Sequence, residues 1–233
     1  MFAKHLVLAL CAGVIGFGAL QPAKAEELKR YNYATGQWET YDPSRLRHTV
    51  RQVPSEFRRK NVRIETAEAP GTIIVDTQRK FLYFVQGDGK AVRYGVGVGR
   101  EGFGWSGVMK IGRKAEWPGW TPPPEMVVRE RKQGHILPAY MEGGPDNPLG
   151  ARAMYLYRNG HDSQFRIHGT NQPWTIGLNM SSGCIRMMNE DVTNLYGRAD
   201  VGAKVVVIGP NGEGRDSVYR EKGFDLLATI FGG

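Results

Sequence analysis

Cysteine is scarce in this sequence. Of 233 residues only two are cysteines, Cys11 and Cys184. Cys11 lies in an apolar N-terminal run, whereas Cys184 stands in the stretch SSGCIRM, residues 181–187. If the N-terminal run is removed, one thiol remains and an internal disulfide is excluded. A leftover thiol in an exported chain is either intermolecular or reactive, and a small buried apolar side chain is the ordinary alternative.

Long hydrophobic runs are equally scarce, since only Leu6 to Leu20 forms one. Lys4 and His5 precede this run, and the small-x-small pattern Ala23-Lys24-Ala25 follows it. This order is typical of a secretory signal peptide cleaved before Glu26. A membrane anchor is the alternative, but a spanning helix needs roughly twenty apolar residues and this run is shorter. We therefore expect residues 1–25 to be a signal peptide and the mature chain to be exported.

The sequence also lacks the spacings that hold metals and the charge excess typical of nucleic-acid binding. No CxxC or HxxxH pair is present, so no metal site is predicted. The formal charge is +8, and removing residues 1–25 takes away two lysines and no acid, which leaves +6. This charge suits an anionic cell wall or membrane surface, although a solvated basic surface has the same composition. Export makes nucleic acid an unsuitable partner.

The first half of the mature chain changes character at Pro70-Gly71. Residues 26–69 are polar with weak periodicity, which predicts an N-terminal extension with one short strand near Val62 to Ile64. Short β-branched and aromatic runs follow at 72–76, 81–85 and 91–98 and are separated by Gly and Asp turns. Closely spaced short strands of this kind favour a β-sandwich or barrel.

The second half continues this pattern up to a closing strand. Runs at 153–157 and 164–168 predict a hairpin, and 204–208 predicts the last strand of a catalytic domain spanning 70–209. A short helix is expected at 189–196, capped by Asn189. Residues 210–233 are expected to be a C-terminal tail with a second short helix at 224–230. The predicted fold class is therefore mainly β, with one or two short helices.

Residues 100–150 are rich in Trp, Pro and Gly and include Pro122-Pro123-Pro124. Such a span is expected to be irregular for most of its length, and long loops in compact domains are often functional. Its large aromatic residues argue against disorder. We predict a covering loop over a site. In the alternative, Trp105, Trp117 and Trp120 fill the core.

The residues around Cys184 fit a thiol nucleophile. A neighbouring histidine lowers the pKa of a thiol and takes its proton, and His168 lies at a predicted strand end sixteen residues before Cys184. The carbonyl of Gly169, or another nearby acceptor, would hold the second imidazole nitrogen. Gly183 permits close approach of an acyl substrate to the backbone N–H groups of residues 183 and 184. Arg186 falls on the same side as the thiol in extended geometry and suits a carboxylate.

Other side chains near the thiol are weaker candidates. Ser181 and Ser182 add hydroxyl groups beside the thiol, and Tyr155 and Trp105 are further candidates for substrate contacts. Each of these residues also has an ordinary structural explanation, such as packing or a surface charge.

Taken together, these segments resemble a known family. The run IHGTNQPWTIGLNMSSGCIRMMNEDVTNLY, residues 167–196, resembles the signature of the L,D-transpeptidase catalytic domain, the YkuD family. Residues 69–84, the YGVGVGREGF stretch and EGGPDNPLGARAMYLY extend the resemblance to about 69–209. The resemblance implies Cys184 as nucleophile, His168 as base, the Gly169 carbonyl as its orienting group and an oxyanion hole at Gly183 and Cys184. Ser182 stands where the family commonly has histidine.

The resemblance also implies a reaction. Cys184 would attack a tetrapeptide stem of peptidoglycan, release the terminal D-alanine and pass the acyl group to an amine. The product would be a 3–3 cross-link or an envelope protein anchored to the wall, formed without metal or organic cofactor. Carbapenem inhibition and a periplasmic or cell-envelope location follow from the same resemblance. An L,D-carboxypeptidase or endopeptidase, or a non-catalytic wall-binding module, remain the alternatives.

Overall fold

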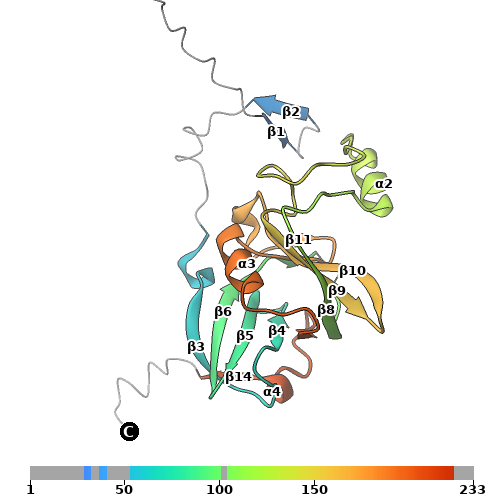
Figure 1. The fold of residues 1–233 in the computed structure, drawn as a ribbon. Coiled ribbons are helices and arrows are strands. Elements are labelled where there is room, and N and C mark those ends of the chain that lie inside the picture. Colours follow the sequence, from blue (N-terminus) through green and yellow to red (C-terminus); the bar gives the residue numbers. More distant parts are fainter. Residues whose placement is uncertain (1–28, 33–36, 41–52, 101–103, 223–233) are drawn as a thin grey trace, which may run out of the picture.

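The computed structural model describes residues 29–32, 37–40, 53–100 and 104–222 (Figure 1). The predicted signal peptide and the predicted helix at 224–230 lie outside these residues. In the described ranges, none of the helices has the length and apolar character needed to span a membrane.

Ten strands form the main sheet, in the order β12-β10-β9-β8-β13-β4-β5-β6-β3-β14. The prediction of a mainly β fold with few helices is confirmed. The strands of this sheet are β3 Lys60–Glu65, β4 Ile73–Asp76, β5 Phe81–Gly87, β6 Lys90–Gly95, β8 Gly107–Glu116, β9 Arg152–Arg158, β10 His161–His168, β12 Ile185–Arg186, β13 Lys204–Ile208 and β14 Arg220–Lys222.

Smaller elements complete the fold. Two further strand pairs are present, and β7 with β11 runs beside the site described below. These strands and the helical segments are β1 Lys29–Asn32 with β2 Gln37–Thr40, β7 Val98–Gly99 with β11 Asn179–Ser181, α2 Pro124–Lys132, α3 Asn189–Tyr196, α4 Arg215–Val218, and the short helical turns η1 Ser55–Phe57 and η2 Pro173–Thr175.

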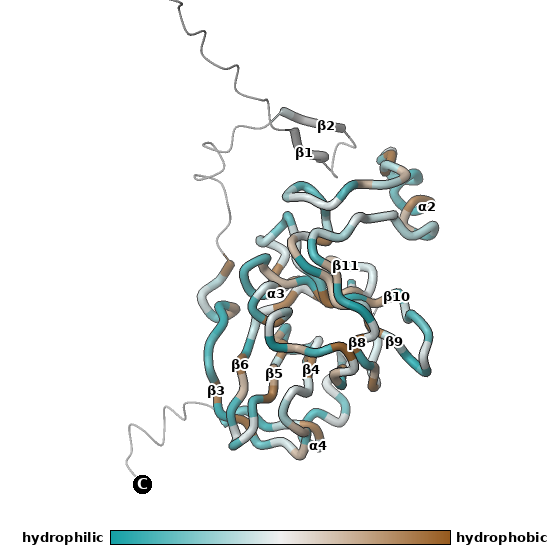
Figure 2. Tube along the Cα trace, in the orientation of Figure 1, coloured by the Kyte–Doolittle hydropathy of each residue, from teal (hydrophilic) through white to brown (hydrophobic). Residues whose placement is uncertain are grey.

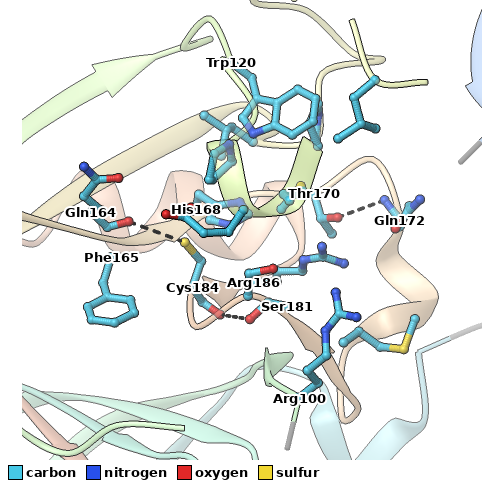
Figure 3. A pocket seen from close by; sticks show the side chains of 18 of the residues that line it. Arg100, Trp120, Gln164, Phe165, His168, Thr170, Gln172, Ser181, Cys184 and Arg186 are labelled. Atoms are coloured by element: carbon cyan, nitrogen blue, oxygen red, sulfur yellow. Dashed lines mark hydrogen bonds between the residues drawn. The ribbon is translucent and has the colours of Figure 1, made fainter. Parts of the chain in front are cut away.

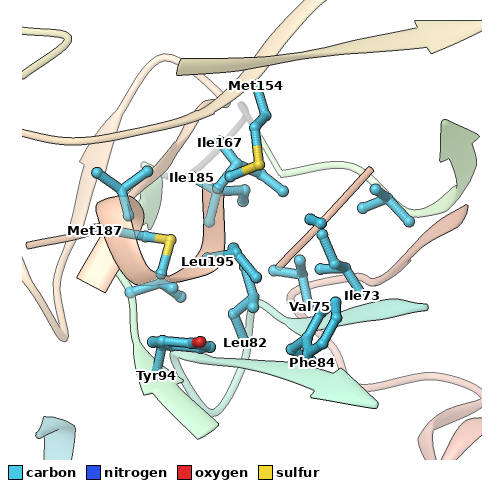
Figure 4. Close-up of a cluster of buried hydrophobic side chains, with 14 of the residues drawn as sticks. Ile73, Val75, Leu82, Phe84, Tyr94, Met154, Ile167, Ile185, Met187 and Leu195 are labelled. Carbon is cyan, nitrogen blue, oxygen red and sulfur yellow. The ribbon is translucent and has the colours of Figure 1, made fainter. Parts of the chain in front are cut away.

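The main core lies between the strands of the sheet and α3. Strand β4 is buried on both faces, so Ile73 and Val75 point into the main core while Ile74 joins a second cluster. Val192 and Leu195 of α3 pack into the main core. Hydrophobic residues accordingly recur along β4, β5 and β6 (Figure 2), and their side chains meet those of β9, β10 and α3 (Figure 4). Burial of this surface is the main stabilising term of the domain.

The main sheet includes strands that precede and follow the predicted catalytic domain, residues 70–209, in the sequence. Strand β3 pairs with β6, and β14 pairs with β3 at the far edge. The predicted strand near residues 62–64 is confirmed as part of β3. The second hydrophobic cluster, which includes Tyr83 and Tyr219, lies between the sheet and the C-terminal segment. The extension and the tail therefore each contribute a strand to the same sheet.

The described part of residues 100–150 is irregular for most of its length, as expected, and the expected cap of α3 is wrong. Residues 100–150 contain a ten-residue strand, β8, because Met109 and Ile111 alternate into the core while the strand pairs with β13 and β9. The same span holds α2. Asn189 does not cap α3: the cap position is Met188, and the Asn189 side chain binds backbone groups elsewhere.

Candidate active site

Cys184, His168 and Arg186 line one cavity of about 420 Å³ (Figure 3). Its walls come from the β10–β12 edge of the sheet, from β11 and from the segment that carries α2. A volume of this size is in the range of small-ligand sites. The cavity is therefore large enough for part of a small organic ligand.

Parallel pairing of β10 with β12 fixes the backbone positions of His168 and Cys184. His168 lies opposite Arg186 in this register, and the N–H of Met187 donates to the His168 carbonyl at 2.8 Å. On its other side His168 lies opposite Ala153 of β9. Cys184 immediately precedes β12, so its backbone is tied to the same edge. The histidine predicted to end a strand does so at a position held by two neighbours.

Burial keeps the imidazole of His168 neutral. The side chain is only 4% exposed, and Nδ1 lies 2.5 Å from the Gly169 carbonyl oxygen. That oxygen only accepts, so Nδ1 carries the hydrogen and Nε2 keeps its lone pair. Burial, together with the charge of Arg186, lowers the pKa of His168 from 6.5 to about 3. The residue is thus a proton acceptor at neutral pH.

The thiol of Cys184 is also in its neutral form at rest. Burial raises its pKa, and the Arg166 backbone N–H and the charges of Arg166 and Arg186 only partly oppose this effect. Sγ lies 4.0 Å from the Gln164 carbonyl oxygen, within reach of weak S–H donation. Attack on an acyl carbon would therefore require proton transfer from the thiol to a base such as Nε2 of His168.

A bulge in β10 directs the Gln164 carbonyl at the thiol. The pairing register with β9 shifts between Asp162 and Arg166, and Gln164 adopts a positive φ of 64°. Bulges of this kind re-aim groups beside active sites. The sequence carries no clear signal of this bulge, because Gln has no preference for positive φ.

The loop before Cys184 is braced by its own side chains. Ser181 Oγ donates to the Cys184 carbonyl at 2.6 Å, and the Gly183 N–H donates to Ser181 Oγ at 3.2 Å. Gly183 has φ +105°, a conformation that favours glycine. The Gly183 N–H, predicted as an oxyanion donor, thus faces Ser181 in the resting structure. Trp105 Nε1 donates to the Gly183 carbonyl at 2.9 Å.

Tyr155 and Trp105 stand behind the site. The described residues that line the main cavity do not include them. The guanidinium carbons of Arg113 and Arg166 lie 3.5 and 4.4 Å from the Tyr155 ring centroid. Trp105 stacks on Phe165, with centroids 4.6 Å apart, and lines a second cavity together with Gly183. Trp105 therefore holds the backbone beside Cys184 from outside the cavity, while Tyr155 packs under two arginine side chains.

The segment around α2 covers the cavity, as a covering loop would. Trp120, Met126 and Arg129 of this segment line it. Arg129 Nη2 donates to Ser182 Oγ at 3.3 Å, which joins the cover to the loop before Cys184. Arg129 was not singled out from the sequence, where it is one of several basic residues in RERK. Arg100, at the end of the glycine-rich stretch, also lines the cavity, and the sequence does not single it out.

Asn189 holds the turn after His168. Its Oδ1 accepts from the Ala151 N–H at 2.9 Å and from the Thr170 N–H at 3.2 Å. Ala151 and Thr170 are both buried. One amide oxygen thereby ties the start of α3 to the start of β9 and to the residue after Gly169.

Within the described ranges no three His, Cys, Asp or Glu side chains come together as a metal site would require. The cavity's lining includes a thiol, an imidazole and guanidinium groups, which can act in nucleophilic attack, proton transfer and anion binding.

Comparisons with known proteins point to one family. The model of the L,D-transpeptidase catalytic domain, YkuD, matches residues 70–207. The probable L,D-transpeptidase ErfK/SrfK of Escherichia coli K12 is 38% identical over 141 residues, 58% of this chain and 43% of that protein. The probable L,D-transpeptidase YbiS of the same strain is 35% identical over 142 residues, 59% of this chain and 44% of that protein. The chain thus matches less than half the length of these relatives.

One solved structure similar to this chain has a different kind of name. It is a crystal structure of a probable carnitine operon oxidoreductase, caia, from Brucella melitensis. It is 46% identical to this chain, covers 69% of this chain and 98% of its own, and has a TM-score of 0.45.

Proposed function

The chain belongs to the L,D-transpeptidase (YkuD) family, and we propose that it is an exported peptidoglycan L,D-transpeptidase with Cys184 as its nucleophile. The observation that carries the proposal is that buried His168, with Nδ1 bound to the Gly169 carbonyl, lines the same cavity as Cys184. The proposed place of action is the cell envelope, which holds the substrate.

The first half-reaction forms a thioester. Cys184 Sγ attacks the carbonyl carbon of the third residue of a tetrapeptide stem, while Nε2 of His168 takes the thiol proton. The tetrahedral intermediate collapses, the bond to the terminal D-alanine breaks, and His168 returns the proton to the leaving amine. The neutral thiol and neutral imidazole of the resting site suit this order of proton transfers.

The second half-reaction uses an amine of another stem. This amine attacks the thioester, loses a proton to His168, and displaces Cys184 as a thiol, so that a 3–3 cross-link forms. An amine of an envelope protein would give wall anchoring by the same step. Arg186, opposite His168 in the sheet register, is proposed to bind a substrate carboxylate and so align the donor.

The test is a product assay with the purified protein and a tetrapeptide stem. We expect free D-alanine and a 3–3 linked dimer from the wild type, and neither from Cys184→Ala. His168→Ala should lower the rate by at least about a hundredfold, since general base catalysis contributes that much. His161→Ala is the matched control, because His161 is exposed at the other end of β10.

Two results would contradict the proposal. Tripeptide without dimer would indicate a carboxypeptidase, in which water replaces the acceptor amine. Equal activity of wild type and Cys184→Ala would remove the thiol from the mechanism. Mass spectrometry after incubation with a carbapenem gives an independent measurement, and we expect an adduct that Cys184→Ala abolishes.

A further inference from the structure

Three arginines from separate parts of the chain face the cavity. Arg100 follows β7, Arg129 lies on α2, and Arg186 lies on β12. The described acidic residues of the lining are Glu125 and Glu130. Glu130 accepts from Arg129 at 3.3 Å and lies 3.1 Å from Nδ1 of His135. The lining of the cavity therefore carries more positive than negative charge.

Arg100 and Arg129 are attached to consecutive residues of the loop before the nucleophile. The Arg100 N–H donates to the Ser181 carbonyl at 3.0 Å, and Arg129 Nη2 donates to Ser182 Oγ at 3.3 Å. In Figure 3 the Arg100 side chain extends toward the region of Arg186. A guanidinium has five N–H donors, so one arginine side chain can bind protein groups and a ligand at the same time.

The electrostatics of this part of the cavity favour an anion. Burial lowers the pKa of Arg100 and the nearby charge of Arg129 lowers it further, while the charge of Glu130 opposes only part of this effect. Two partly buried guanidiniums that repel each other are stabilised when a carboxylate binds between them, and arginine binds carboxylates in a bidentate manner. Arg186 is already assigned to one carboxylate in the proposed function, which leaves Arg100 and Arg129 for a second.

We propose that Arg100 and Arg129 form a second carboxylate subsite that selects acyl donors with a free acid group away from the scissile carbonyl. This inference rests on the proposed function, because it takes the donor to be a peptide stem. Such a stem has two candidate groups, the side-chain carboxylate of its third residue and the carboxylate of its terminal residue. Because Arg129 lies on α2, the subsite is complete only when the cover lies over the cavity.

The experiment measures binding without turnover. Calorimetry on Cys184→Ala compares a tetrapeptide stem with two analogues, one amidated at the side chain of the third residue and one at the terminal carboxylate. We expect one amidation to weaken binding about tenfold or more, as loss of a charge-assisted bond predicts. Adding Arg100→Gln or Arg129→Gln should remove most of the preference for the free acid over the amide. The affinity for the amidated stem should stay nearly unchanged.

Matched variants separate binding from folding. Arg131→Gln removes the same charge from an exposed position of the same helix and should keep the preference. Arg129→Lys should keep more of it than Arg129→Gln. The proposal is overturned if no stem binds, if acid and amides bind alike, or if the Gln variants weaken acid and amide equally.

The two proposals fail in different ways. If the wild type makes no dimer but Cys184→Ala shows the arginine-dependent preference, the proposed function fails and the subsite stands. If the wild type cross-links stems while acid and amide bind equally well, the subsite fails and the function stands.

Discussion

His168 differs from an exposed histidine in its proton affinity. Burial lowers its pKa from 6.5 to about 3, while burial raises the pKa of the Cys184 thiol. A neutral thiol beside a neutral imidazole is therefore the resting state over a wide range that extends well below neutral pH. An exposed pair would instead lose its base near the ordinary histidine pKa.

This difference predicts the pH dependence of acylation. With a carbapenem as acyl donor, the rate constant should stay level from about pH 8 to about pH 5, because His168 stays unprotonated over this range. The measurement is the rate of adduct formation by mass spectrometry in a series of buffers, with the fold checked at each pH. A midpoint near 6.5 would show that the imidazole titrates as an exposed group.

At the residue scale the sequence singles out His168 and Cys184, which line one cavity, but it does not predict the residues that hold them in place. His168 and Cys184 follow from a strand end, a lone thiol and a specific motif. Asn189 is read as a helix cap because Asn prefers that position, but the buried N–H groups of Ala151 and Thr170 take its oxygen instead. Such long-range partners are not encoded in the local sequence, since they depend on how separate segments pack.

At the element scale, hydrophobic alternation predicts the hairpins and the closing strand, but β8 and α2 inside the span 100–150 are not predicted individually. The Trp, Pro and Gly residues that flank β8 dominate the composition of this span, and the exposed Val108 hides the alternation of the buried Met109 and Ile111 with Lys110. The sequence of α2 has no strong apolar face, and none of its residues is buried. Its place over the cavity comes from contacts such as Arg129 to Ser182.

The hydrogen bonds that Asn189 of α3 accepts from the backbone beside β9 and β10 give a prediction at this scale. Asn189→Ala leaves two buried backbone N–H groups without their acceptor, and we expect a loss of about 2–4 kcal/mol in the free energy of unfolding. Asn189→Asp keeps an acceptor oxygen and should recover part of that loss. Urea denaturation measures the effect.

A neighbouring position provides the control. Glu190→Ala changes the next residue of the same helix at an exposed position and should change stability by less than about 0.5 kcal/mol. A loss for Asn189→Ala no larger than this would mean that water replaces the amide oxygen.

At the scale of the whole molecule, the sheet separates the site from the segment that closes the fold. Strands β10 and β12 lie at one edge of the sheet, and β3 and β14 lie at the other. The C-terminal segment is held by the carboxylate of Asp76, which is fully buried. Arg215 Nε lies 2.5 Å and Tyr219 OH lies 2.8 Å from Asp76 Oδ2.

The hydrogen bonds to Asp76 outweigh the effect of its burial and favour the charged form of its carboxyl group. Burial alone would raise the pKa of Asp76, but bonds from Arg215, the Arg79 N–H and Tyr219 lower it below its usual value. A depressed carboxyl pKa contributes stability above the unfolded-state pKa of 3.8, and this contribution is lost as pH falls through the folded-state value. Attachment of residues 215–222 should therefore weaken in acid.

Removing Arg215 tests this attachment. Arg215→Ala leaves a buried carboxylate without its guanidinium, and we expect a loss of about 3–5 kcal/mol in the free energy of unfolding at pH 7. Asp76→Asn combined with Arg215→Ala should lose less than the sum of the single variants, because no unpaired charge remains. Arg220→Ala, an exposed position on β14, is the matched control and should stay within about 0.5 kcal/mol of wild type.

The same variants show how far the two edges of the sheet depend on each other. The strands β9, β8, β13, β4, β5, β6 and β3 lie, in this order, between the β10–β12 edge and β14 of the C-terminal segment. Where Arg215→Ala remains folded, the acylation rate of Cys184 should match the wild type, because the register of β10 with β12 is set locally. A lower rate in a fully folded sample would contradict this separation and would mean that the packing of residues 215–222 reaches the thiol through the core.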